Sequence, residues 1–261
     1  MPAKKRVLNL VPSRDTGSDW TYDDAVGGGM ARARVALPDQ VDLRATWWRV
    51  GDQGLTGSCV GWAAADGVGR YVLTEAGKIT RSQRLSPRFI WMSSKERDEF
   101  RDRPTSFVEE AGTSLKAAMN IGRRYGFALE KEVPFEVDTT MWAGPESALY
   151  ASAARRRISY INLDRDLSRW KSWLAAKGPI LAGLWVDKHW MNLSGDGELD
   201  SWHAGSADGG HAVCIVGYRE DGRFIVRNSW GTSWGHRGFA YVSPDYLRAG
   251  FFPESYGASG D

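Results

Sequence analysis

Apolar residues recur at helical spacing through much of the first half of the chain. Residues 60–72 form one such stretch directly after a glycine-rich turn, and Ser58 is placed to cap the helix that they predict. A second helical pattern covers residues 85–91, with Ser86 as its expected cap. A third runs from residue 112 to a stop near residue 126. This half of the chain is therefore predicted to be mainly helical.

Near residue 150 the pattern changes to a mixture of helix and strand. Residues 167–176 predict a short helix, and residues 180–186 predict a strand after a Gly-Pro break. The last strands are expected between residues 212 and 242. The intervening residues 187–208 are typical of a turn-rich loop, and residues 255–261 of a polar tail. The pattern predicts an α+β fold, with a helical lobe followed by a mainly antiparallel β lobe.

One predicted hairpin brings two polar side chains together. If its loop has an even number of residues and is centred between Glu220 and Asp221, Val213 lies opposite Asn228. His211 is two residues from Val213 and therefore shares a face with Asn228. Diagonal neighbours in such a pair lie about 7–8 Å apart, within reach of long side chains. We expect Asn228 to orient the imidazole of His211.

Cys59 is predicted at the exposed start of the buried helix. A free thiol has a pKa of about 8.5, which a helix start and a nearby imidazolium lower to about 3.5–7.5. The alternative is a buried structural cysteine, but a histidine oriented by an amide supplies the other parts of thiol catalysis. Cys214, inside an apolar strand and on the opposite face from His211, is expected to be inert packing, which argues against a shared metal site. Two cysteines do not make a disulfide framework.

These motifs resemble those of the papain-like cysteine peptidases, the family of papain and the cathepsins. The resemblance covers roughly residues 37–250 and is carried by Gln53-Gly54 with Gly57-Ser58-Cys59, by Gly210-His211-Ala212-Val213 with Val216-Gly217-Tyr218, by Asn228-Ser229-Trp230-Gly231-Thr232-Ser233-Trp234-Gly235, and by Leu37-Pro38 with Val41-Asp42-Leu43-Arg44. It implies two lobes, residues 37–150 and residues 151–261, the second one β-barrel-like. The active cleft would lie between them.

The resemblance also implies the catalytic roles. The Cys59 thiolate would attack the scissile carbonyl, and His211 would take the thiol proton and pass it to the leaving amine. Asn228 would hold the imidazole, and Gln53 with the Cys59 amide would stabilise the oxyanion. The expected activity is that of a cysteine endopeptidase acting on peptide or protein substrates. No metal or cofactor is expected.

Further residues are assigned to substrate binding by the same resemblance. Gly112 would offer its backbone to the substrate, Ala212 would line the pocket for the second residue before the cut, and Trp230 would cover the contact between the histidine and the asparagine. The chain departs from the family at Thr56, where most members have a disulfide-forming cysteine, and at Val60, where they have tryptophan. Both departures fit a disulfide-free branch of the family, such as a bacterial one.

Residues 1–36 lie outside the resemblance. The segment is short, lacks the helical pattern of the family propeptides, and holds apolar residues, Trp20, Tyr22 and a hinge-like glycine triplet at 27–29. We expect it to act as a strap in or beside the cleft. A packing arm or a mobile tail would have the same composition.

Composition bears on whether the protein binds nucleic acid, spans a membrane or is secreted. Because 34 basic residues face 32 acidic residues, no overall field favours nucleic acid or a membrane. No stretch reaches the roughly 18 apolar residues of a membrane span, and the N-terminus does not resemble a signal peptide. A cytoplasmic monomer is expected, with leaderless export left open. Two other functions remain open, a peptide-binding pseudoenzyme and a thiol acyltransferase.

Overall fold

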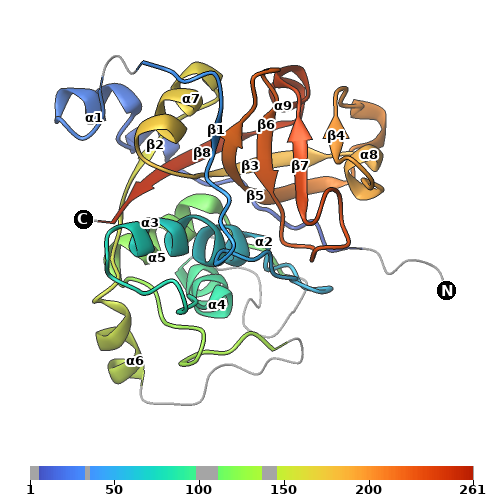
Figure 1. The fold of residues 1–261 in the computed structure, drawn as a ribbon. Helices are drawn as coiled ribbons and strands as arrows, with labels where there is room; N and C mark the ends of the chain where they lie inside the picture. The colour runs from blue at the N-terminus through green and yellow to red at the C-terminus, as the bar shows by residue number, and fades with distance from the viewer. Residues whose placement is uncertain (1–5, 33–35, 98–110, 137–145, 261) are drawn as a thin grey trace.

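The computed structural model describes residues 6–32, 36–97, 111–136 and 146–260. Helices gather on one side of a sheet in the first half of the chain (Figure 1). They are α2 (Cys59–Gly61), a π-helical stretch (Trp62–Gly69), α3 (Arg70–Glu75), α4 (Pro87–Arg97), α5 (Leu115–Arg124) and α6 (Glu146–Ala153). The predicted cap of the second helix is confirmed, since Ser86 Oγ accepts from the Phe89 amide at 3.0 Å. The third helix is capped by Ser114, whose Oγ accepts from the Ala117 amide at 3.3 Å.

Among the described residues, the second half of the chain and one short strand from the first half form an eight-stranded sheet. Its strands are β1 (Val41–Asp42), β2 (Ser159–Asn162), β3 (Ile180–Val186), β4 (Glu198–Leu199), β5 (Gly209–Tyr218), β6 (Phe224–Arg227), β7 (Phe239–Val242) and β8 (Phe251–Ser259). The order is β2-β8-β3-β5-β6-β7-β4, with β1 paired to β5, and the only parallel pair among the described strands is β4 with β7. The sheet is open, so the barrel-like lobe expected from the resemblance is wrong in this detail, whereas the two-part α+β fold is confirmed.

The expected polar tail is a strand. Residues 251–259 form β8, which lies between β2 and β3 within the sheet. Tyr256 and Ala258 are fully buried there, and Ser255 buries its hydroxyl against the carbonyl of Asp164. Because its residues from 255 onward are mostly small or polar, this strand was not evident from the sequence pattern. Gly257 is needed at its position, because a Cβ there would collide with the ring of Trp173. The helix α7 (Leu167–Ala176) and strand β3 coincide with their predicted ranges.

The N-terminal region is more ordered than its sequence suggests. A short helix, α1 (Tyr22–Gly27), begins at a capping box in which Thr21 and Asp24 exchange hydrogen bonds. Tyr22 and Ala25 are buried beside the sheet. The glycine triplet at 27–29 ends this helix, with Gly29 at a φ of 75°, so it caps α1 and is not the expected hinge. The sequence pattern of residues 1–36 did not indicate this short helix.

Strand β5 separates two hydrophobic cores. Ala212, Cys214 and Val216 point into the core shared with the helices. Val213 and Ile215 point into a second core on the other face, where α1 and α7 pack. Because side chains alternate across a strand and both faces of β5 meet a core, β5 is buried on both faces. His211 lies on this strand and is buried with it.

Candidate active site

Cys59 is the first residue of α2, as the sequence predicts. The expected cap is absent, because the Ser58 hydroxyl pairs with the Thr56 hydroxyl at 2.6 Å and makes no bond to a helix amide. The thiol is fully buried. Burial raises the pKa of Cys59 to about 11, while the backbone N–H groups of Ala212 and Val60 act in the opposite direction. The thiol is therefore neutral here, contrary to the lowered pKa that its position predicts.

His211 and Asn228 meet as predicted. Cys214 pairs with Arg227, a register that places Val213 opposite Asn228. A bulge follows between Ile215 and Gly217, so the loop itself differs from the even-numbered one expected. The Nε2–H of His211 donates to Asn228 Oδ1 at 2.7 Å. Its buried Nδ1 has no hydrogen-bond partner among the described residues and is the nitrogen left to exchange a proton.

Burial also controls the charge of the imidazole. Burial lowers the pKa of His211 to about 4, the hydrogen bond to Asn228 raises it, and the nearby Arg6 guanidinium lowers it further. Trp230 covers the pair, with its ring centroid 4.8 Å from that of His211. Trp190 packs on both rings. The shielding role assigned to Trp230 therefore has its geometry in place.

Gln53 is fully buried beside this pair. Its Oε1 accepts from the Ser229 hydroxyl at 2.7 Å, and its backbone amide donates to the Ser229 carbonyl at 2.8 Å. Its Nε2 donates to the Thr56 carbonyl at 2.9 Å. Since an amide nitrogen carries two hydrogens, one remains for a substrate oxygen. Gln53 is thus locked in place next to the residue that follows Asn228.

The chain's own N-terminal residues cross this site. In the crossing segment, defined as residues 6–12, Asn9 forms a bridge with Gly210, and the Leu10 amide donates to the Gly210 carbonyl at 3.1 Å. A Cβ on Gly112 would lie 1.5 Å from the Asn9 carbonyl oxygen. The Val11 amide donates to the Thr113 carbonyl at 3.2 Å. The segment therefore contacts Gly112, an expected substrate-binding residue, on the helical side and Gly210 on the sheet side.

Side chains fix the same segment. Leu10 is buried against Gly183 and Phe252, next to the strand that carries Ala212. Beyond the segment, the Ser13 amide donates to Glu254 Oε1 at 2.6 Å. Figure 1 shows the first described residues of the chain and α1 on opposite sides of the molecule. The intervening residues thus traverse its width over the site.

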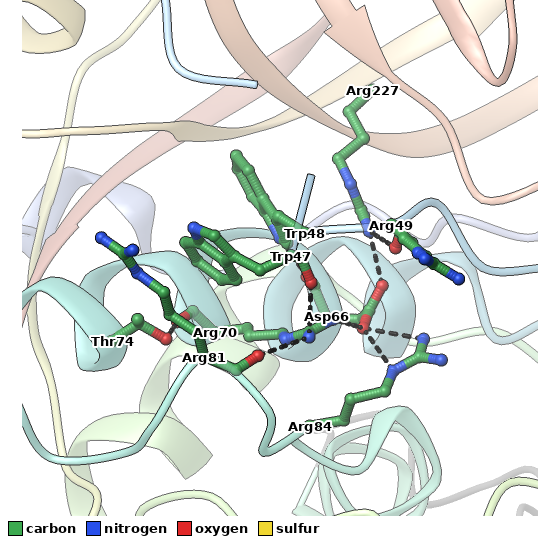
Figure 2. Close-up of polar contacts among 9 residues, drawn as sticks. All are labelled: Trp47, Trp48, Arg49, Asp66, Arg70, Thr74, Arg81, Arg84 and Arg227. Atoms are coloured by element: carbon green, nitrogen blue, oxygen red, sulfur yellow. Dashed lines mark hydrogen bonds and ion pairs between the residues drawn. The ribbon is translucent and has the colours of Figure 1, made fainter. Parts of the chain in front are cut away.

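A buried carboxylate, Asp66, links the segments that carry Cys59 and Asn228. The sequence pattern did not predict this role. Figure 2 shows Asp66, on the π-helical stretch after α2, bonded to three guanidinium groups. The distances are 3.3 Å to Arg70, 2.9 Å to Arg84 and 2.6 Å to Arg227. These cations hold the pKa of Asp66 below its usual value despite the opposing effect of burial. The sequence signal that could have indicated a buried, ion-paired carboxylate is a single acidic residue within a run of small apolar residues.

The same cluster reaches the segment before Gln53. Arg70 donates to the Trp47 carbonyl at 2.8 Å and Arg227 to the Arg49 carbonyl at 2.7 Å, as Figure 2 also shows. Arg227 directly precedes Asn228, and Asp66 lies on the helical run that begins with Cys59. The segments that carry the expected catalytic residues are therefore joined at one point.

Among the described residues, no three His, Cys, Asp or Glu side chains gather as a metal site requires. In the same part of the chain, no helix has the length and apolarity to cross a membrane. Cys214 is buried, with its pKa raised by burial to about 12, and lies against Gly67. His189 and His203 are exposed and pack against each other, with ring centroids 4.6 Å apart.

Known proteins resemble this chain in fold and in sequence. Xylellain, a cysteine protease from Xylella fastidiosa, superposes with a TM-score of 0.80 at 23% identity over 99% of this chain and 97% of its own. An uncharacterized peptidase C1-like protein of Acanthamoeba polyphaga mimivirus is 27% identical over 77% of this chain, and mouse cathepsin J is 25% identical over 81%. The chain spans 68% and 62% of those two relatives. Residues 37–248 match the family described as papain family cysteine protease, and the chain belongs to that family.

Proposed function

We propose that this chain is a cysteine endopeptidase whose own crossing segment holds the site closed. One observation carries the proposal. The Nε2–H of His211 is fixed on Asn228, which leaves the buried Nδ1 unpaired on the strand whose Ala212 amide bonds the Cys59 thiol. This arrangement gives the thiol a base of fixed tautomer.

The residues then act in sequence. His211 Nδ1 takes the proton of Cys59, and the thiolate attacks the scissile carbonyl to form a tetrahedral oxyanion. The free hydrogen of Gln53 Nε2 and the Cys59 amide stabilise this charge. The imidazolium gives its proton to the leaving amine, and an acyl-enzyme remains. Water, deprotonated by the same imidazole, then hydrolyses the thioester and regenerates the thiol.

The path of the crossing segment supports cleavage within a chain. It passes from Arg6 near Trp230 to Val11 near Thr113 without ending at the site. A cleft that accommodates a continuous peptide on both sides of the nucleophile suits an endopeptidase. The same path supports closure, because Cys59 and His211 have no exposed surface and are both neutral around pH 7.

The test opens the site without removing α1. Leu10→Glu places a charge in a buried apolar position, which disfavours the closed segment. The matched control is Leu37→Glu, because Leu37 is 44% exposed. An internally quenched peptide library should be cleaved at least tenfold faster by Leu10→Glu than by the wild type or the control. Cys59→Ala should abolish that gain.

Each other reading has its own outcome. Absence of cleavage by a folded Leu10→Glu protein whose Cys59 still reacts with iodoacetamide would favour the peptide-binding pseudoenzyme. Products extended by an added amine, detected by mass spectrometry in place of hydrolysis, would favour the acyltransferase. Equal cleavage by wild type and Leu10→Glu would contradict closure while leaving the peptidase activity intact.

A further inference from the structure

The crossing segment shows how one side chain is held at the end of the cleft near Trp230. The Arg6 guanidinium donates to Asp52 Oδ1 at 2.7 Å, to the Gly54 carbonyl at 2.7 Å and to the Trp230 carbonyl at 3.3 Å. Its central carbon lies 5.6 Å from the centroid of the Trp230 ring. A carboxylate, two carbonyls and an aromatic face are the groups that recognise a guanidinium.

These groups are positioned without help from Arg6. The Gly54 amide donates to Asp52 Oδ1 at 2.9 Å and so orients the carboxylate. Asp52 forms a bridge with Trp230, and the Gly231 amide donates to the Gly51 carbonyl at 2.9 Å. Gly54 has a φ of 61°, a left-handed conformation that favours glycine at the turn presenting its carbonyl. The receptor groups therefore belong to the enzyme body and would remain after the segment leaves.

The position of the segment places these groups on the leaving-group side of the cut. Asn9 lies between Gly112 and Gly210, and Leu10 continues away from Trp230. Gly112 and Ala212 are the residues expected to hold the part of the substrate before the cut. Arg6 is three residues from Asn9 in the other direction and approaches the Trp230 ring that covers His211. It therefore lies beyond the catalytic pair.

We infer that Asp52, the Gly54 carbonyl and Trp230 form a substrate subsite for arginine or lysine at the first or second residue after the cut. The inference rests on the proposed peptidase function and deepens it by naming a substrate class. Asp52 is the specificity-determining residue, because it supplies the negative charge in direct contact with the guanidinium. Its side chain is 49% exposed, so the expected selectivity is moderate and salt-dependent.

The experiment uses the full chain carrying Leu10→Glu and Arg6→Gln, which opens the site and vacates the subsite. Quenched peptides differ only in arginine or citrulline, its neutral analogue of the same shape, at the first or second position after the cut. Arginine should raise kcat/KM about tenfold at one of these positions, equivalent to about 1.4 kcal/mol. Adding Asp52→Asn should reduce the preference for arginine over citrulline, measured within that variant, to threefold or less. Adding Asp42→Asn instead, at an exposed aspartate that pairs with Arg44, should leave the preference intact.

The possible failures are distinguishable. Cleavage of arginine and citrulline peptides at equal rates, or a preference that survives Asp52→Asn, would overturn the subsite and leave the peptidase assignment standing. If no peptide is cleaved, the proposed function fails and the subsite fails with it.

Discussion

Replacing Asp66 by asparagine is expected to destabilise the protein more than any exposed acidic substitution. The side chain keeps its shape but loses the charge on which Arg70, Arg84 and Arg227 converge. Asp66 is fully buried, and Arg70 and Arg227 are only 4% and 3% exposed, so water cannot replace the lost carboxylate. The Arg84 side chain is 40% exposed and is solvated without difficulty.

The magnitude follows from the two buried arginines. Removing one partner of a buried pair costs about 3–5 kcal/mol. Domains have total stabilities of about 5–15 kcal/mol, so the loss would be a large share. For a chain of this size, 1 kcal/mol corresponds to about 2–4 °C, which gives a fall in Tm of roughly 6–20 °C. Because the pKa of Asp66 is lowered on folding, its stabilisation is present above the ordinary value of about 3.9 and is lost as pH falls through the folded pKa.

Urea and thermal unfolding, followed by the fluorescence of the 13 tryptophans, measure the effect. Asp42→Asn is the control, since its side chain is 41% exposed and the pair with Arg44 is worth about 0–1 kcal/mol. Asp66→Asn should also flatten the loss of stability below about pH 4. If the two variants unfold at the same urea concentration, the arginines do not depend on Asp66 and the reasoning is wrong.

Three further outcomes are expected. In the wild type, the free energy of unfolding should fall by on the order of 3 kcal/mol between about pH 6.5 and pH 4, because His211 binds a proton in the unfolded chain but not in the buried site. His211→Gln should remove this slope in urea titrations at a series of pH values. In the Leu10→Glu protein at mildly acidic pH, iodoacetamide should add one mass, on Cys59; equal labelling of Cys214 would contradict the buried, raised-pKa thiol described for it. Adding Gln53→Ala to the same protein should lower kcat by roughly 10²–10³, and an unchanged kcat would remove Gln53 from the oxyanion site.

Much of the catalytic geometry could be predicted from local rules. The Gly178-Pro179 break fixed the end of α7 and the start of β3, since proline cannot continue a helix and Gly178 adopts a φ of 146° that favours glycine. The pairing of His211 with Asn228 followed from the period of two along strands. The bulge after Ile215 leaves this face unchanged because it lies between the site and the loop.

The features that could not be predicted depend on tertiary contacts between residues far apart in the sequence. Residues 255–259 of strand β8 are small or polar apart from Tyr256, and their burial depends on Trp173 and the neighbouring strands. The Ser58 hydroxyl bonds Thr56 because the turn brings the two together. The role of Asp66 as a buried ion-pair centre depends on arginines up to 161 residues away in the sequence. The raised pKa of Cys59 depends on burial, which its position at the start of a helix does not reveal.

The central strand β5 has a consequence for how the molecule unfolds. Its side chains enter both hydrophobic cores, so neither core can open without exposing the other. We expect the two halves to melt as one cooperative unit, with the amides around His211 exchanging hydrogen only through global unfolding. The imidazole would thus be anchored in the slowest-exchanging part of the chain, while the crossing segment that covers it is held by two backbone hydrogen bonds, the buried Leu10 side chain and Arg6.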